Sequence, residues 1–193
     1  MARLAVLASG NGGNFQAIVE ALRLRAAGAG PVHDCVLLVY DRRAAYAAER
    51  ARALGVSSRY LRYIGRSREE AEAELTALLD GAGAQLIALA GFMRILSSEF
   101  VRSRAGRIVN VHPALLPRYP GAHAIERAFE AGEREFGVTV HFVDEGMDTG
   151  PILIQEGFRP EAGTSLAEIE RRTHEIEHRI YPAEVLRLLD AID

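Results

Sequence analysis

The feature that most constrains the fold of this chain is the repeated alternation of short apolar runs with segments of helical periodicity. Each parallel strand needs a crossover, usually a helix, to return the chain to the same end of a sheet. The alternation therefore predicts an α/β fold, a doubly wound, mostly parallel sheet with helices on both faces. The expected strands are Leu4–Ala8, Cys35–Tyr40, Val56–Tyr60, Gln85–Ala90 and Arg107–Val111, and the expected helices begin near Phe15 or span Ala44–Leu54, Ser67–Leu79 and Ser97–Arg104.

The C-terminal part of the chain follows a different pattern. After a predicted helix around Ala122–Ala131, the segments Gly137–Val143 and Pro151–Phe158 alternate as strands around a Gly-rich turn. This pattern predicts an antiparallel C-terminal strand pair added to the sheet. Ser165 is a typical N-terminal cap for one last helix, which Pro182 is expected to break or restart.

Length and composition narrow the class of protein further. We expect the 193 residues to form one domain, 1–193, because no linker or repeat divides them. The apolar runs are too short to cross a bilayer and no signal-peptide pattern is found, so no membrane association is expected. Cys35, the single cysteine, is expected in the core and favours a cytoplasmic location. The net charge of -3 argues against binding to nucleic acid.

The loop Ser9–Asn14 lies between the first predicted strand and its helix. A Gly-rich turn at a helix N-terminus presents backbone N–H groups that can bind a phosphate. The loop lacks the Lys of a P-loop, and Phe15 stands where a dinucleotide fingerprint has its third Gly, although Asp41 resembles a ribose-binding acid. Phosphate binding and a tight turn without any ligand both remain open.

Asn110 and His112 alternate by two at the end of the fifth predicted strand, so their side chains are expected on one side of it. An amide N–H and a protonated imidazole are suitable donors to an oxyanion. Asp148 is a candidate partner that would raise the pKa of His112. The alternative is a structural histidine before Pro113.

Residues 174–178 match the zinc-binding pattern H-E-x-x-H. The alternative is a solvated charged helix face, which the nearby Pro182 favours because it interrupts the helix that would support a metal site. No metal is therefore expected. His174, Glu177 and Tyr181 also share one helical stripe, which could line a polar ligand.

Four segments together resemble the phosphoribosylglycinamide formyltransferases of purine biosynthesis, and the resemblance runs from end to end. The most specific part is Asn-x-His-Pro with the distant Asp148, which the wider formyltransferase superfamily shares. The resemblance implies the formyltransferase fold, with a nucleotide-binding half at about 1–105 and a catalytic and folate-binding half at about 106–193. The four segments are Ser9–Asn14, Ala90–Leu96, Asn110–His123 and Asp148–Gln155.

The resemblance implies transfer of the formyl group of 10-formyltetrahydrofolate, the co-substrate, to the amine of glycinamide ribonucleotide. Asn110 and His112 would stabilise the tetrahedral oxyanion, and Asp148 would raise the pKa of His112. The implied nucleotide-binding residues are Gly12, Gly13, Asn14, His174, Glu175, Ile176 and Glu177. The implied folate-binding residues are Arg68, Met93, Arg94, Ile95, Leu96, Asn110, Asp144, Glu145, Gly146, Met147 and Asp148.

The sequence departs from this family in two places. Gly13 stands where a Ser is common, and Gly13→Ser is expected to be tolerated unless the backbone there has a positive φ. Asp41-Arg42-Arg43 replaces an Asn-Lys-like segment. The first change removes a possible hydroxyl contact to the phosphate, and the second touches no catalytic position that the resemblance implies.

A formyltetrahydrofolate hydrolase is the main alternative function, because it would share the Asn, His and Asp core. A methionyl-tRNA formyltransferase would need a further domain and a basic surface. Two further alternatives belong to other functional classes: a nicotinamide-dependent oxidoreductase and a non-catalytic phosphoribosyl-binding module. Whether the protein is a monomer or a homodimer is left open.

Overall fold

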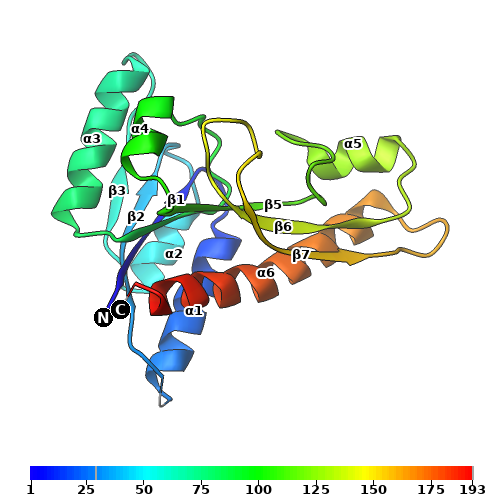
Figure 1. Ribbon diagram of the computed structural model, residues 1–193, viewed down its shortest axis with the longest axis horizontal. Helices are drawn as coiled ribbons and strands as arrows, with labels where there is room; N and C mark the ends of the chain where they lie inside the picture. The colour runs from blue at the N-terminus through cyan, green and yellow to red at the C-terminus, as the bar shows by residue number, and fades with distance from the viewer. Residues whose placement is uncertain (29, 193) are drawn as a thin grey trace.

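The computed structural model describes residues 1–28 and 30–192, which form a seven-stranded sheet in the order β3-β2-β1-β4-β5-β6-β7. Strands β1 to β5 pair in parallel, whereas β6 pairs antiparallel with both β5 and β7. The sheet thus confirms the predicted parallel core and antiparallel C-terminal pair (Figure 1). The strands are β1 (Arg3–Ala8), β2 (Asp34–Tyr40), β3 (Ser58–Tyr60), β4 (Leu86–Leu89), β5 (Ile108–His112), β6 (Phe136–Phe142) and β7 (Ile152–Phe158).

Helices cover both faces of the sheet (Figure 1). One core cluster joins α1, α2 and α6 to Leu4 and Val6 of β1, and a second joins α3 and α4 to Ala5 and Leu7. Both faces of this central strand are therefore buried, which explains why its sequence is an unbroken apolar run. The helices are α1 (Gly13–Ala26), α2 (Ala47–Ala53), α3 (Arg68–Gly81), α4 (Ser98–Ser103), α5 (Ala124–Glu130) and α6 (Leu166–Asp190).

The expected break at Pro182 is wrong, because α6 continues through it to Asp190. A proline inside a helix has no N–H to donate to the preceding turn. Here Tyr181, Pro182 and Val185 are all buried, so packing against the sheet holds the helix together despite the missing hydrogen bond. The hydroxyl of Tyr181 donates to the carbonyl oxygens of Leu89 and Val109, at 2.9 and 3.0 Å.

The local signals for other elements are confirmed. Ser67 and Glu70 form a full capping box at α3, and the Ser165 hydroxyl accepts the N–H of Glu168 at α6. Cys35 is buried, and burial raises the pKa of its thiol to about 12. Within the described residues, none of the helices combines the length and apolarity that a membrane crossing requires.

The strand order indicates the ligand-binding edge of the sheet before any side chain is considered. From β1 the chain builds outward through β2 and β3 on one side, and through β4 and β5 on the other. The order of the strands therefore reverses between β1 and β4, and in open parallel sheets a ligand is expected at the carboxyl ends of the strands at this point.

Candidate active site

The loops that follow β1 and β4 are joined by hydrogen bonds. The N–H of Ser9 donates to the carbonyl oxygen of Gly91 over 3.0 Å, and the N–H of Met93 donates to the Ser9 hydroxyl over 2.7 Å. These contacts bring the loops after the first and fourth strands together at one edge of the sheet.

The loop before α1 is fixed by close contacts with α2. Gly12 has a φ of 77°, and a Cβ there would lie 2.8 Å from the Cβ of Ala47. Arg50 of α2 donates from Nε to the carbonyl oxygen of Asn11 over 2.8 Å and from Nη2 to its Oδ1 over 3.0 Å. Gly12 makes no side-chain cap, so the first N–H groups of α1 are available to an anion.

Gly13 lies next to the imidazole of His178. Its φ is not positive, but an added Cβ would lie 2.8 Å from Nε2 of His178. His178 is exposed and belongs to α6. The ring of His178 therefore occupies part of the space that a serine side chain at position 13 would need.

Two predicted nucleotide-binding segments meet at Glu177, which is buried. The Asn14 side-chain amide donates to Oε2 of Glu177 over 2.9 Å, and Nδ1 of His174 lies 3.2 Å from the same oxygen. This hydrogen bond raises the pKa of His174. Oδ1 of Asn14 is buried and has no partner among the described residues.

The rest of the predicted α6 segment does not face this point. Glu175 is exposed and pairs with Arg171, and Ile176 packs in the core. Tyr181, which shares the stripe with His174, is completely buried rather than lining a ligand. Burial and the nearby Glu177 raise its pKa well above the ordinary tyrosine value.

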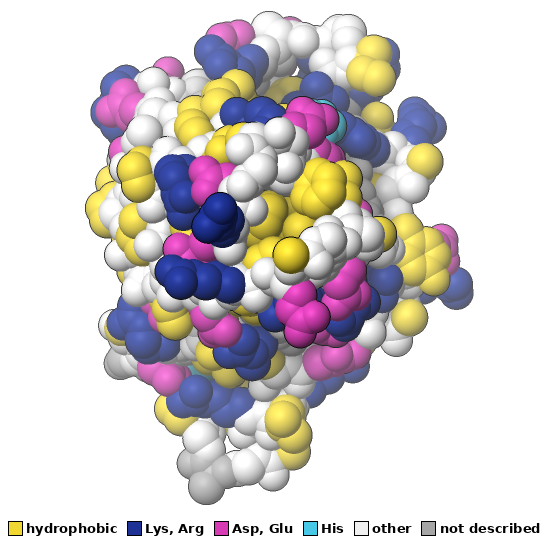
Figure 2. Space-filling view, turned by 90° about the vertical axis from the view of Figure 1, so that its right-hand side faces the viewer, with side chains coloured by type: hydrophobic (Ala, Val, Ile, Leu, Met, Phe, Trp, Pro, Cys, Tyr) yellow, Lys and Arg dark blue, Asp and Glu magenta, His cyan; other side chains and the backbone are white. Residues whose placement is uncertain are grey.

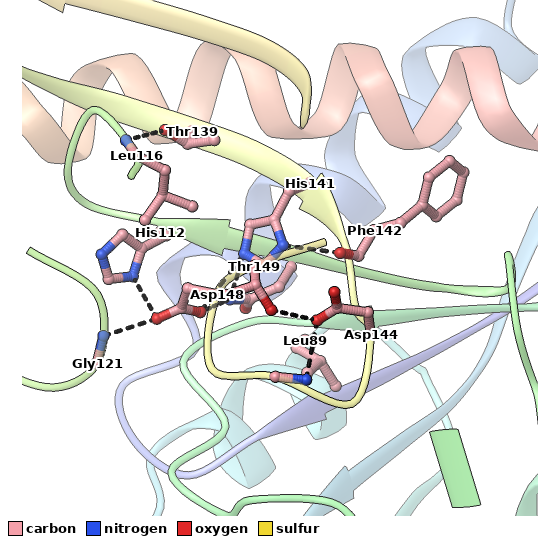
Figure 3. A network of polar contacts seen from close by, with 12 residues as sticks. Leu89, His112, Leu116, Gly121, Thr139, His141, Phe142, Asp144, Asp148 and Thr149 are labelled. Atoms are coloured by element: carbon pink, nitrogen blue, oxygen red, sulfur yellow. Dashed lines mark hydrogen bonds and ion pairs between the residues drawn. The ribbon is translucent and has the colours of Figure 1, made fainter. Parts of the chain in front are cut away.

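Asn110, His112 and Asp148 converge at the end of β5, as Figure 3 shows for the last two. Nδ1 of His112 lies 3.4 Å from Oδ2 of Asp148, and the Asn110 amide donates to Oδ1 over 3.4 Å. The N–H of Gly121 donates to Oδ2 over 2.7 Å. Asp148 has a φ of 55°, a strained conformation for a residue that bears a side chain.

The turn that carries Asp148 is built around close backbone contacts. A Cβ at Gly150 would overlap the carbonyl oxygen of Phe142, so only glycine fits there. Asp144 accepts from the N–H of Gly146 over 3.0 Å. It also accepts from the Thr149 hydroxyl over 2.7 Å, as Figure 3 shows. Asp144 therefore stabilises the turn that presents Asp148.

The electrostatics correct one expectation. Burial lowers the pKa of His112 below 6.5, and this effect outweighs the raising effects of Asp148 and the Tyr119 carbonyl. Asp148 acts in the expected direction, but it does not keep His112 charged at neutral pH in the resting protein. Burial raises the pKa of Asp148, yet hydrogen bonds from His141 and Gly121 and the nearby histidines lower it to about 2.

His141 belongs to this group, although the sequence reasoning missed it. Its Nε2 lies 3.3 Å from the Asn110 amide nitrogen and 3.5 Å from Oδ1 of Asp148. Its Nδ1 donates to the carbonyl oxygen of Phe142 over 2.8 Å (Figure 3). The available signal was the strand register, because Asn110 of β5 pairs with His141 of β6.

The predicted folate segments border the same region. Met93, Ile95 and Met147 are exposed, and a Cβ at Gly121 would lie 2.9 Å from the sulfur of Met147. Figure 2 shows hydrophobic side chains gathered in a hollow on one face, surrounded by charged ones. Exposed apolar side chains of this kind can pack against the ring system of a ligand.

Two charged anchors hold these segments in place. Nε of Arg94 lies 2.5 Å from Oδ2 of Asp41, whose side chain is fully buried, and its guanidinium lies 4.9 Å from the ring centre of Tyr63. Glu145 pairs with Arg102 of α4 over 2.6 Å. Arg68 is exposed at the start of α3, and Leu96 packs against the core.

The H-E-x-x-H pattern is not arranged as a metal site. His174 bonds to Glu177, and the ring of His178 lies beside Gly13. In the part of the chain that the structure describes, no group of three or more His, Cys, Asp or Glu side chains could hold a metal ion.

Comparison with known proteins identifies the family. The formyl transferase family model matches residues 2–185. Phosphoribosylglycinamide formyltransferase of Bacillus subtilis is 41% identical over 192 residues, covering 98% of this chain and 95% of that protein. The crystal structure of phosphoribosylglycinamide formyltransferase from Bacillus halodurans has a TM-score of 0.91 at 38% identity, covering 99% of this chain and 97% of that one.

A longer relative matches over a short part of its length. The trifunctional purine biosynthetic protein adenosine-3 of Drosophila melanogaster is 44% identical over 190 residues, which are 97% of this chain but 14% of that protein. The family match, the full-length relative and the shared fold agree with one another. The chain is an enzyme of the formyl transferase family and belongs to its phosphoribosylglycinamide formyltransferases.

Proposed function

We propose that this enzyme transfers the formyl group of 10-formyltetrahydrofolate to the amine of N1-(5-phospho-D-ribosyl)glycinamide, a step of purine biosynthesis. The observation that carries the proposal is the convergence of Asn110, His112 and Asp148 at the end of β5, on the same edge of the sheet as the loop before α1. Full-length relatives that bear the name of this activity support it.

The nucleotide would bind along α1 and α6. Its phosphate would accept hydrogen bonds from the N–H groups at Gly12, Gly13 and Asn14, which Arg50 holds in place. Its ribose hydroxyls would bond to Glu177, whose carboxylate the Asn14 amide holds in place. Because Asn14 and Glu177 come from opposite ends of the chain, both halves, about 1–105 and 106–193, would contribute to nucleotide binding.

The folate would lie between the loop of Met93 to Leu96 and the turn of Asp144 to Asp148. Exposed Met93, Ile95 and Met147 would pack against its ring systems. Arg68 at the start of α3 would bind the carboxylate tail.

In the reaction the amine nitrogen attacks the formyl carbon, and the carbonyl oxygen becomes an oxyanion. The Asn110 amide and the protonated Nδ1 of His112 would donate to this oxygen. Their contacts with Asp148 and His141 are 3.3 to 3.4 Å long, so they can be exchanged for a stronger bond to the oxyanion. The lowered pKa of His112 in the resting protein rises again when an anion forms beside it.

The intermediate then collapses to products. The amine nitrogen loses a proton, the folate N10 gains one, and the bond between the formyl carbon and N10 breaks. Asp148, with a pKa of about 2, stays ionised, so it stabilises the charged His112 and orients the transfer of the proton through water.

The test is to incubate the protein with 10-formyltetrahydrofolate, with and without the nucleotide, while measuring tetrahydrofolate and formylated nucleotide. We expect equal amounts of both products, formed only when the nucleotide is present. Tetrahydrofolate released without the nucleotide would indicate a hydrolase instead.

A further inference from the structure

The second ring nitrogen of His112 has a partner that the reaction does not use. Nε2 lies 2.8 Å from the backbone carbonyl oxygen of Tyr119, in the loop between β5 and α5. A carbonyl oxygen can only accept a hydrogen bond, so Nε2 must carry a hydrogen. The proton that His112 gains or loses is therefore on Nδ1, the nitrogen that faces Asp148.

Tyr119 is itself held in a strained position. It has a φ of 54°, and its hydroxyl donates to Oε1 of Glu133 over 2.9 Å. Arg118 pairs with the other oxygen of Glu133 over 2.9 Å, and the Arg127 guanidinium lies 5.8 Å from the centre of the Tyr119 ring. The ring also packs against the apolar cluster of α5, β6 and α6. Strain of this kind persists only where surrounding contacts fix the residue.

We propose that Tyr119, anchored by Glu133, is a positioning residue that keeps the hydrogen of neutral His112 on Nε2 and so assigns Nδ1 to the formyl oxygen. The assignment of the hydrogen depends on the contacts of the chain alone. The role toward the formyl oxygen rests on the proposed function.

The charges around His112 show why this carbonyl matters. Asp148, from the turn after β6, and the Tyr119 carbonyl both favour the protonated ring. Burial, His141 of β6 and Arg127 of α5 disfavour it. Favourable and unfavourable effects on the protonated ring therefore act together. Loss of the Tyr119 contact would lower the pKa of His112 further. It would also allow the neutral ring to place its hydrogen on Nδ1.

Three variants test the proposal. Tyr119→Phe removes the hydroxyl that reaches Glu133 and keeps the ring, and Glu133→Ala removes the acceptor. Glu133→Gln keeps an acceptor for the tyrosine hydroxyl, so it should behave nearly as the unmodified protein. Glu135→Gln is the matched control, because that carboxylate pairs with Arg159 instead.

The first measurement is the ¹⁵N NMR titration of the His112 ring in protein labelled on histidine. In the unmodified protein we expect the neutral ring to carry its hydrogen on Nε2. In Tyr119→Phe and Glu133→Ala we expect a mixture of both tautomers and a lower pKa. A neutral ring with its hydrogen on Nδ1 in the unmodified protein would overturn the proposal, even if no variant folds.

The second measurement is the pH profile of formyl transfer. Tyr119→Phe and Glu133→Ala should lower kcat about tenfold at alkaline pH and less at acid pH, with KM for both substrates nearly unchanged. Unchanged tautomers and profiles in both variants would also reject the positioning role. If the NMR result is as expected but no nucleotide is formylated, the proposed function fails while the tautomer assignment stands.

Discussion

The carboxylate of Asp148 lies 3.4 Å from Nδ1 of His112, although Asp148 lies in the turn after β6, His112 ends strand β5, and the sequence alone does not show that they meet. The same carboxylate accepts the N–H of Gly121 over 2.7 Å. Asp148 therefore links the turn after β6 to the end of β5 and to the loop that carries Gly121.

Replacing Asp148 should abolish most turnover without preventing substrate binding. Asp148→Asn keeps the size of the side chain but removes the negative charge that favours protonated His112, so we expect kcat to fall on the order of 10³-fold, with an optimum shifted toward acid pH. Steady-state kinetics over a pH series measure this. His112→Ala combined with Asp148→Asn should lose little beyond the worse single variant.

The control for this pair is Asp80→Asn, which changes an exposed carboxylate that pairs with Arg104. It should retain the turnover and the pH profile of the unmodified protein. An Asp148→Asn enzyme with an unchanged profile, or losses that multiply in the double variant, would disprove the partnership of Asp148 and His112.

Stability toward acid should also depend on Asp148. The pKa of Asp148 is lowered from 3.8 to about 2 in the folded protein. The ionised carboxylate therefore adds to the free energy of unfolding above about pH 4, and this contribution is lost as the pH falls toward 2. A difference of this size corresponds to about 2 kcal/mol. Denaturant unfolding at several pH values should show this loss, and Asp148→Asn should lack it.

His112 adds to acid sensitivity at a higher pH. The pKa of His112 is lower in the folded protein than the ordinary value of 6.5, so the unfolded chain binds the proton more readily. The free energy of unfolding therefore decreases as the pH falls below about 6.5. The variant His112→Gln should remove this part of the pH dependence. A stability profile that stays the same in both variants would contradict the assigned shifts.

The adjacent glycines of the α1 loop should respond differently to serine. Gly12→Ser places a side chain at a φ of 77° and against Ala47, and we expect a loss of about 2 to 3 kcal/mol in the free energy of unfolding. Gly13→Ser meets only the end of the exposed His178 side chain, which can rotate away, so we expect a loss below about 1 kcal/mol.

Chemical denaturation measures both variants, and titration of Gly13→Ser with the nucleotide shows whether the introduced hydroxyl adds a contact. Adding His178→Ala to Gly13→Ser should strengthen nucleotide binding if the histidine ring competes for the space. Equal stability of the two glycine variants would show that the loop does not have the backbone conformation described.

Arg50 should affect binding of the nucleotide rather than of the folate. Arg50→Lys keeps the charge but loses the two bonds to Asn11, so the loop would orient its N–H groups less well. We expect KM for the nucleotide to rise about fivefold to tenfold, with KM for the folate unchanged.

Arg52→Lys is the matched control, because Arg52 lies on the same helix and pairs with the exposed Glu49. It should leave both KM values unchanged. Equal rises for the two substrates in Arg50→Lys would point to general loss of structure instead of a defect in the loop.

Asp41 should influence the folate side. Asp41→Asn removes the buried charge that pairs with Arg94 over 2.5 Å, so the loop from Met93 to Leu96 loses an anchor. We expect KM for the folate to rise about threefold to tenfold, while KM for the nucleotide stays the same. Asp34→Asn, at the exposed start of β2, the strand that Asp41 follows, should change neither KM value. A rise in KM for the nucleotide with KM for the folate unchanged would place Asp41 outside folate binding.

Local patterns in the sequence were sufficient to predict the layers of the fold and the position of the candidate site. The spacing of apolar residues distinguishes strands from helices, and a parallel sheet brings the ends of β1, β4 and β5 to one edge. The alternation of Asn110 and His112 is likewise a property of any extended strand. The family resemblance added the chemistry, because its motifs lie at these strand ends.

Other features depend on groups that come together only in the folded chain. His141 joins the site through the register of β5 and β6, Tyr119 reaches His112 through a strained loop, and Pro182 stays helical because its surroundings are buried. The pKa of His112 is the balance of burial against several charges, and burial cannot be read from spacing. Short-range periodicity therefore predicts where the candidate site residues lie, whereas long-range packing determines their partners and their protonation.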